Sequence, residues 1–431
     1  MNGARPRASR TGPAAERHPP VPARRPPAGL GGLSGLPNVS IAGVVAAVAL
    51  AAIGALSFGL LGGPLPDLPI GGRGGAGDVP NRTPNATQVF TPDLPDKPHV
   101  RGTILFAKSG NIWAVTGDDA ISRITNGGHE MFPTWSSDGK TIYYLDIREK
   151  KAIVPSEGSD SPYTLDYPVL SRMAADGSGA KEIQDGLYSW AGGRYEYFYG
   201  IWQPALSPDG RTFAIISDSP DPFTLDYTLQ LLPAKGGAPT RLQLPEDYGM
   251  GHNDPAWSPD GAQIAFTYNH RDGALGRPRI ALYTVKTGHQ RFLTDFGFAQ
   301  PSFSPDGHLL AAVRTTARGR DVVLLDAVTG AEVLRVTDDG HSFAPAWSPA
   351  GDQVAFLRAN GMSIDLVVVT LGGAGRTLST TAQEQLTSQS GLDGTSRPSW
   401  FIPASQLPSP APATPASPRG VSPSPSASAG G

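Results

Sequence analysis

The sequence predicts an all-β protein, a six-bladed propeller of four-stranded antiparallel blades. Three observations predict this fold: a repeat of roughly 45 to 50 residues, a Ser-Pro-Asp-Gly turn in most copies, and strand patterns on both sides of that turn. The chain has 431 residues, with 53 glycines, 43 prolines and no cysteine. This composition predicts a turn-rich chain and excludes a disulfide scaffold, a thiolate metal site and a cysteine nucleophile.

The first 99 residues are not expected to belong to the folded domain. Residues 1–40 hold six arginines and one acidic residue among prolines, alanines and glycines, which predicts a disordered basic arm. Residues 41–62 are without charge and long enough to cross a bilayer as a helix. Residues 63–99 are rich in glycine and proline and predict a flexible spacer. The sequence therefore predicts one transmembrane helix at 41–62.

The charges around residues 41–62 predict the orientation of the chain. Arginines are more frequent before this segment than after it, so the positive-inside rule places the N-terminus in the cytoplasm and the domain outside. Three alternatives stay open: a cleaved signal peptide, twin-arginine export signalled by Arg24 and Arg25, and a buried helix of a soluble domain. Residues 403–431 are almost entirely Pro, Ser, Ala, Thr and Gly and predict a disordered tail, which leaves residues 100–402 to fold.

Residues 100–402 contain a repeated strand, turn and strand. In the turn, Pro fixes φ, Asp bonds its own backbone and Gly accepts a positive φ. The apolar run after the turn is nearly unbroken, as expected for a strand buried on both faces. Two copies depart from the pattern, at Ser137 and Ala350. The copies are PTWSSDGKTIYYL from 133, PALSPDGRTFAII from 204, PAWSPDGAQIAFT from 255, PSFSPDGHLLAAV from 301, PAWSPAGDQVAFL from 345 and the partial copy PSWF from 398.

Pairing between the two ends of this domain is expected to close a ring. Alternating stretches such as 280–285 and 321–326 complete four strands per repeat, which is one blade. Residues 102–115 read as a second and third strand without a first, whereas residues 397–401 supply only a first strand. We expect these segments to form one blade together, which gives six blades and removes a free sheet edge.

The P-x-W-S-P-D-G repeat and its strands resemble the WD-type repeat of TolB-like six-bladed propellers. The resemblance covers residues 100–402. It implies an extracytoplasmic propeller that acts as a protein-binding platform. No residues match the partner-binding segments of TolB, so the resemblance implies the fold and not the partner.

Residues just before each repeat proline are expected to line one mouth of the central channel, where the inner strands start. Three of the eight histidines fall at these positions, each after a glycine. One interpretation is a polar, partly cationic funnel for a peptide terminus, a small ligand or a metal, and the simpler one is that the imidazoles cap their loops. The mouth residues are His129, Glu130, Trp202, Gln203, His252, Asn253, Asp254, Gln300, His341, Ser342 and Arg397.

No catalytic motif accompanies the repeat. The chain has no G-x-S-x-G elbow, and the adjacent Asp and Gly of its turns do not fit the S-x-D-x-G box of sialidases. We therefore expect no enzyme, no resident metal and no cofactor. The alternative is a metal-dependent, lactonase-like hydrolase in the channel, for which Glu130, Asn253 and Asp254 are the candidate ligands.

Two similar segments, SDSPYTLDY at 159–167 and SDSPDPFTLDY at 217–227, are expected between the second and third strands of neighbouring blades, on one rim. Residues 188–202 between them form the most aromatic stretch of the chain. This pattern predicts an aromatic, acidic wall for a protein partner, unless the rings only pack the insertion onto its own blade. The candidate partner-binding residues are Tyr188, Trp190, Tyr195, Tyr197 and Tyr199.

The sequence as a whole predicts a membrane-anchored platform in the cell envelope that binds a protein or senses a ligand. The net charge of −3 argues against a nucleic-acid surface. We expect a monomeric propeller with a partner protein in the envelope.

Overall fold

The computed structural model describes residues 100–117, 120–156, 159–223, 225–244, 251–269 and 278–407. The predicted arm, transmembrane helix and spacer, and all but the first residues of the predicted tail, lie outside these ranges. Within the described ranges, none of the helices is long and apolar enough to cross a membrane.

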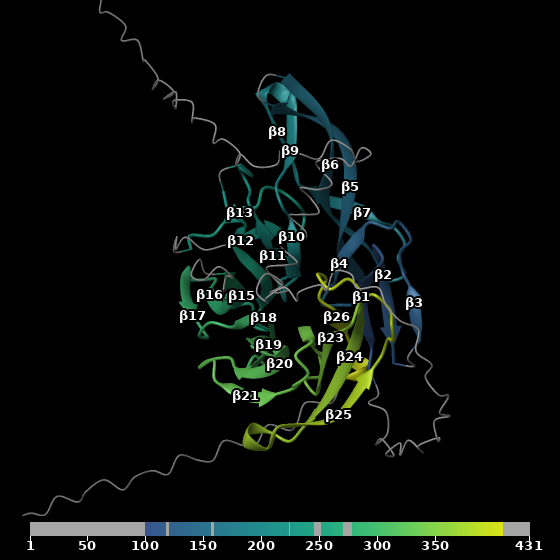
Figure 1. Ribbon diagram of the computed structural model, residues 1–431, viewed down its shortest axis with the longest axis vertical. Coiled ribbons are helices and arrows are strands. Elements are labelled where there is room, and N and C mark those ends of the chain that lie inside the picture. The colour runs from purple at the N-terminus through teal and green to yellow at the C-terminus, as the bar shows by residue number, and fades with distance from the viewer. Residues whose placement is uncertain are drawn as a thin grey trace, which may run out of the picture. The chain divides into compact units, whose positions relative to one another are not determined.

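The repeat folds into six four-stranded antiparallel sheets (Figure 1). Blade 1 contains β26 (Ser399–Phe401), β1 (Thr103–Lys108), β2 (Asn111–Thr116) and β3 (Ile121–Arg123). Blade 2 contains β4 (Glu130–Trp135), β5 (Thr141–Ser156), β6 (Ser159–Ala174) and β7 (Lys181–Asp185). Blade 3 contains β10 (Trp202–Leu206), β11 (Thr212–Ser217), β12 (Thr228–Pro233) and β13 (Thr240–Arg241).

The second half of the ring repeats this order. Blade 4 contains β14 (His252–Trp257), β15 (Gln263–Asn269), β16 (Pro278–Thr284) and β17 (His289–Phe292). Blade 5 contains β18 (Phe298–Phe303), β19 (Leu309–Thr316), β20 (Gly319–Asp326) and β21 (Glu332–Arg335). Blade 6 contains β22 (Ser342–Trp347), β23 (Gln353–Asn360), β24 (Ser363–Gly372) and β25 (Ser379–Gln385).

The first strands of the blades surround the central channel. Each contacts the first strands of both neighbouring blades, in the cyclic order β4, β10, β14, β18, β22 and β26. In blade 1, β26 pairs antiparallel with β1, which places Trp400 opposite Ile104. The predicted six-bladed fold is therefore confirmed, and so is the predicted blade built from both ends of the domain.

The core lies between the blades. Side chains of the second strands are buried on both faces, as the unbroken apolar runs predict, and Ile264, Ala265 and Phe266 of β15 are all fully buried. A strand covered on both faces contributes roughly 1.5–3 kcal/mol for each large apolar side chain that it removes from water. The ring is thus held together by contacts between blades as well as within them.

The predicted Ser-Pro-Asp-Gly turns form as the residue types require. In blade 4, Asp260 Oδ1 accepts hydrogen bonds from Ser258 Oγ at 2.6 Å and from the backbone N–H of Ala262 at 3.0 Å, and Gly261 has a φ of +68°. These two hydrogen bonds stabilise the carboxylate and lower the pKa of Asp260. We call the face of the ring that carries these turns the turn face.

Both ends of the described chain lie on the turn face. The ring of Phe401 packs against Trp135 of blade 2, with 5.6 Å between ring centroids, and Arg101 forms an ion pair with Asp352 in the turn of blade 6. Residues assigned to the tail begin with a short 3-10 helix, η3 (Ala404–Gln406), and Gln406 Oε1 accepts a hydrogen bond from Gly102 N. The opposite face, where the first strands begin, is called the mouth face.

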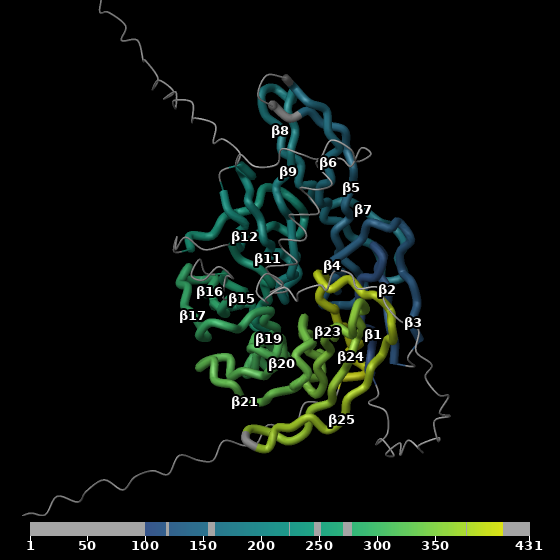
Figure 2. Tube along the Cα trace, viewed as in Figure 1, coloured from purple at the N-terminus to yellow at the C-terminus, as the bar shows by residue number. Residues whose placement is uncertain are grey.

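A projection rises from the mouth face over blades 2 and 3 (Figures 1 and 2). Its first part is the hairpin of β5 and β6, which pair without interruption from Thr141 and Ala174 to Ser156 and Ser159. Its second part is a two-stranded ribbon in the connection between blades 2 and 3, formed by β8 (Leu187–Trp190) and β9 (Tyr195–Phe198) and joined by the 3-10 helix η1 (Ala191–Gly193).

The hairpin corrects one sequence expectation. Residues 159–167 were expected between two strands, but they lie within β6, because the ladder with β5 continues to the tip of the hairpin. The similar segment 217–227 is the expected connection between β11 and β12, with Ser217 as the last residue of β11. Both segments rise from the mouth face, as predicted.

Candidate functional site

The first strands of blades 2 to 6 each contain a β-bulge at the repeat proline and the residue before it. That residue has a φ between 52° and 54° in every case, a conformation that costs a non-glycine residue about 1–3 kcal/mol. Such a conformation persists only where neighbouring groups fix it. The five residues are Phe132, Gln203, Asp254, Gln300 and Ala344.

Side chains from preceding blades hold these strained backbones. Asp254 N donates to Gln203 Oε1 of the preceding blade at 2.7 Å, and Ala344 N makes the same contact with Gln300 Oε1 at 2.8 Å. Gln300 N donates to Thr267 Oγ1 at 2.9 Å. These bonds link blades 3 to 6 around the channel, which gives the glutamines before two of the repeat prolines, Gln203 and Gln300, a structural role.

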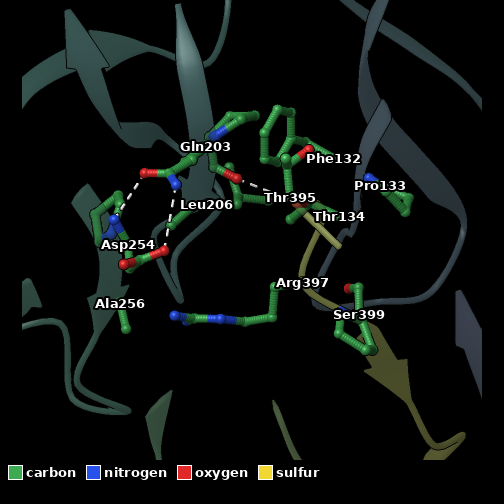
Figure 3. Close-up of a pocket in the computed structure, with 14 residues that line it drawn as sticks. Phe132, Pro133, Thr134, Gln203, Leu206, Asp254, Ala256, Thr395, Arg397 and Ser399 are labelled. Atoms are coloured by element: carbon green, nitrogen blue, oxygen red, sulfur yellow. Dashed lines mark hydrogen bonds between the residues drawn. The ribbon is translucent and has the colours of Figure 1, made fainter. Parts of the chain in front are cut away.

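A partly open pocket of about 210 Å³ lies in the channel between the first strands of blades 1 to 4. It has room for several water molecules. Three of the predicted mouth residues meet there, namely Gln203, Asp254 and Arg397 (Figure 3). The other lining residues are Phe132, Pro133, Thr134, Pro204, Ala205, Leu206, Pro255, Ala256, Thr395, Pro398 and Ser399.

Asp254 is the buried acid of this pocket. Its Oδ1 accepts a hydrogen bond from Gln203 Nε2 at 3.2 Å, and its Oδ2 accepts one from Thr267 Oγ1 at 3.0 Å. Burial raises the pKa of Asp254, whereas the positive charge of Arg397 and the bond from Thr267 oppose the rise. The carboxyl is therefore held in place by protein groups while it faces the pocket.

Arg397 is the positively charged residue of the pocket. Its Nη2 is buried without a hydrogen-bond partner among the described residues. Its side chain extends across the pocket towards the side on which Asp254 and Ala256 lie (Figure 3). Burial lowers the pKa of Arg397, and the negative charge of Asp254 opposes this effect. The two charges influence each other without forming a direct ion pair.

The remaining predicted mouth residues lie away from this pocket. Glu130 Oε2 accepts hydrogen bonds from Gly128 N and His129 N, so it caps its own loop. His129 and His341 are both exposed. Glu130 thus does not converge with Asn253 and Asp254, and no group of three His, Cys, Asp or Glu side chains that could hold a metal ion occurs in the described part of the chain.

His252 lies inside the ring, between blades 3 and 4, rather than at the mouth. Its side chain is only 6% exposed and packs on the rings of Phe266 and Tyr268, with centroid distances of 4.8 and 5.3 Å. Its Nδ1 accepts a hydrogen bond from Leu229 N at 3.0 Å. Burial, aided by the positive charge of Arg241, lowers the pKa of His252 to about 3. It is a neutral core residue at physiological pH.

The aromatic residues predicted to bind a partner gather on the ribbon. Tyr188 pairs with Tyr197 across the two strands and Trp190 pairs with Tyr195, so all four side chains lie on the same face of the ribbon. Phe223, from the connection between β11 and β12, contacts Tyr188, Trp190 and Tyr197 at 5.1 to 6.1 Å. We call these five residues the crest.

The crest is open to solvent. Phe223 is 54% exposed, and the four ribbon residues are half-buried. The hairpin holds the ribbon at three points. Glu196 forms an ion pair with Lys150 of β5 at 2.7 Å, its backbone carbonyl accepts a hydrogen bond from Tyr163 Oη, and Tyr195 Oη donates to Asp160 Oδ1 of β6 at 3.1 Å. The hairpin thus fixes the ribbon while leaving the crest uncovered. Tyr199, also predicted, packs instead at the base, where its hydroxyl bonds to Asp185 O.

Sequence reasoning missed Phe223, because this residue belongs to blade 3 and contacts the ribbon only in the folded protein. It also missed Phe132, Thr134 and Thr395 in the pocket. Phe132 immediately precedes a repeat proline, so the position alone would have found it, whereas the polar character of His129 and Glu130 favoured those residues.

Asp218 joins the base of the ribbon to blade 3 and makes stability depend on pH. Its Oδ1 accepts a hydrogen bond from Gly200 N at 2.8 Å, and burial raises its pKa to about 6 despite this bond. Because the folded state binds this proton more tightly than the unfolded state, the free energy of unfolding falls as pH rises through 6. The full effect, from below pH 3.8 to neutral pH, is about 3 kcal/mol.

We expect Asp218→Asn to remove this dependence while Asn still accepts the bond from Gly200. The measurement is denaturant unfolding between pH 4 and 7.5, with Asp209→Asn on the turn face as the control. A variant that keeps the wild-type pH dependence would show that Asp218 is not the titrating group.

Comparison with solved structures finds several that are similar to part of the chain. The chain is similar to the structure of putative TolB from Agrobacterium tumefaciens, with 20% identity, a TM-score of 0.46, and coverage of 70% of this chain and 94% of that chain. It is also similar to TolB from Acinetobacter baumannii, with 19% identity, a TM-score of 0.49, and coverage of 69% and 66%.

An enzyme is also among the similar structures. Oligogalacturonate lyase in complex with manganese has 15% identity and a TM-score of 0.43, with coverage of 63% of this chain and 74% of that chain. No family model and no curated protein match the chain. At these identities and TM-scores, function has to be argued from the chain's own residues.

Proposed function

We propose that this propeller is a protein-binding module of the cell envelope, and that the crest is its docking surface. The observation that carries the proposal is the exposed ring cluster of Tyr188, Trp190, Tyr195, Tyr197 and Phe223. Aromatic residues dominate binding hot spots because they bury a large area with few rotatable bonds. The rigid hairpin behind the ribbon lowers the cost of ordering them.

The orientation of the ring supports this assignment. Both chain ends lie on the turn face, whereas the crest lies on the mouth face. With the predicted transmembrane helix at 41–62 as an anchor, a spacer attached to the turn face leaves the mouth face accessible to a partner. The proposal therefore includes a single-pass anchor with the propeller outside the cytoplasm.

The function is tested with the substitution Phe223→Asp. A charge at the centre of the crest removes an apolar contact and opposes burial, so we expect the affinity for the partner to fall at least 30-fold, the equivalent of roughly 2 kcal/mol. The matched control is Met362→Asp, since Met362 is a fully exposed apolar residue in the connection between β23 and β24 of blade 6, also on the mouth face.

The full chain serves as bait for crosslinking in membranes of its own cells, followed by affinity measurement with the purified candidate. The proposal holds if one protein is captured by the wild type and by Met362→Asp and is lost with Phe223→Asp. Equal capture by Phe223→Asp and Met362→Asp would show that the docking surface is not the crest.

A further inference from the structure

The channel pocket contains a charged group that the protein leaves unsatisfied. Arg397 Nη2 is buried and has no hydrogen-bond partner, and its guanidinium makes no ion pair within the described residues. A buried donor without a partner is unfavourable, and more so when it is charged. A guanidinium presents a planar fork of donors that matches a carboxylate.

The carboxylate of Asp254 lines the same pocket, and it needs a hydrogen-bond donor, whereas Arg397 needs an acceptor. Asp254 is 9% exposed, and among the described residues each of its oxygens accepts one hydrogen bond, from Gln203 and from Thr267. A carboxylate oxygen has a second acceptor site, so Asp254 retains capacity for a donor. The pocket thus offers one guanidinium and one carboxylate that are not paired directly.

These charges restrict the ligand. A simple anion would bond Arg397 but would be repelled by Asp254, and a simple cation would leave the guanidinium unsatisfied. A molecule with both charges satisfies both groups and adds no net charge to a buried site. The pocket volume of about 210 Å³ suits a small molecule.

Much of the remaining wall is apolar, beside the polar side chains of Thr134, Thr395 and Ser399. The rings of Pro133, Pro204 and Pro255 line the pocket together with Leu206 and Ala256. These side chains offer no charged partner, but they accept a short aliphatic group. The site therefore combines two opposite charges with an apolar wall.

We propose that the channel pocket binds a small free α-amino acid with an aliphatic side chain, its carboxylate on Arg397, its ammonium group on Asp254 and its side chain against the prolines. The pocket does not include the crest, so this proposal does not depend on the proposed docking function. The propeller would then bind a small molecule in its channel as well as a protein partner at the crest.

The test is calorimetric titration of the purified full chain with L-alanine and L-valine. Propionate is L-alanine without the ammonium group, and ethylamine is L-alanine without the carboxylate. We expect one saturable site for an amino acid, and binding at least tenfold weaker for propionate and for ethylamine, because each lacks one charge-assisted hydrogen bond.

Variants connect the binding to the two side chains. Arg397→Met and Asp254→Asn are each expected to weaken amino-acid binding at least tenfold. Arg358→Met is the control, because Arg358 is half-buried and forms an ion pair with Asp339 away from the pocket. Thermal unfolding of each variant checks that it is folded. If Asp254→Asn is misfolded, amino-acid binding by Arg397→Met alone tests the proposal.

Three results would overturn the proposal. The first is the absence of saturable binding for both amino acids. The second is propionate or ethylamine binding as tightly as L-alanine, which would indicate a site for a simple ion. The third is undiminished binding by folded Arg397→Met, which would place the ligand elsewhere.

Discussion

Removing β26 is expected to open the ring and to cost the domain most of its stability. This strand is the channel-side strand of blade 1. Its Trp400 is 8% exposed and donates from Nε1 to the carbonyl of Arg101 at 2.8 Å. Its Ser399 Oγ also accepts a hydrogen bond from Trp135 N of blade 2. The strand thus joins blade 1 to blade 2 as well as the two ends of the domain.

The single substitution Trp400→Ala is expected to lower the free energy of unfolding by about 3–5 kcal/mol. Domains of ordinary stability have about 5–15 kcal/mol in total, so truncation after Arg397, which deletes the whole strand and exposes the edge of β1, should abolish cooperative unfolding. Both changes are measured by denaturant unfolding followed by tryptophan fluorescence and circular dichroism.

The matched control is truncation after Leu407, which removes only residues beyond η3. It should leave the unfolding midpoint unchanged. If truncation after Arg397 unfolds as cooperatively and at the same midpoint as this control, the closure of the ring does not stabilise the domain.

Acid is expected to destabilise the ring through His252. In the unfolded chain the imidazole has its ordinary pKa of 6.5, whereas in the folded chain its pKa is about 3. Above pH 6.5 both states are neutral and the full stability is present. As pH falls, the unfolded state binds the proton first, and stability is lost between pH 6.5 and 3, by about 4–5 kcal/mol at the acid end.

The variant His252→Gln isolates this contribution. Glutamine does not titrate, and its Oε1 can accept the hydrogen bond from Leu229 N. We expect the variant to be less stable than the wild type at pH 7.5, because it loses ring contacts. This difference in unfolding free energy should narrow by about 2–3 kcal/mol between pH 7 and 4.5, since the opposite contribution of Asp218 is the same in both proteins. The exposed His129→Gln serves as the control, and equal acid sensitivity of both variants would exclude His252 as the cause.

Much of the fold was predictable because its determinants are local. The turn residues fix their own geometry, as the hydrogen bonds of Asp260 and the positive φ of Gly261 show, and the apolar runs predict strands buried on both faces. The incomplete copy at 398 predicted the pairing of β26 with β1. The length of the β5 and β6 hairpin was not predictable, since its polar segment 159–167 carries no apolar run.

The candidate site was predicted only in part, because its geometry depends on groups from several blades. In a regular strand His252 and Asp254 would lie on one face, but the bulge at Asp254 breaks the alternation. One side chain therefore enters the core between blades 3 and 4, and the other enters the channel.

The sequence by itself determined the fold, the number of blades and the positions that precede each repeat proline, since these follow from local turn and strand chemistry. The tertiary structure decided that Arg397 lies unpaired near Asp254 and that Phe223 completes the crest. Arg397 and Asp254 are distant in sequence, and the closing of the ring through β26 brings them together, whereas Phe223 reaches the ribbon from the neighbouring blade. Pairings of this kind depend on the packing of neighbouring blades, which no local pattern of residues specifies.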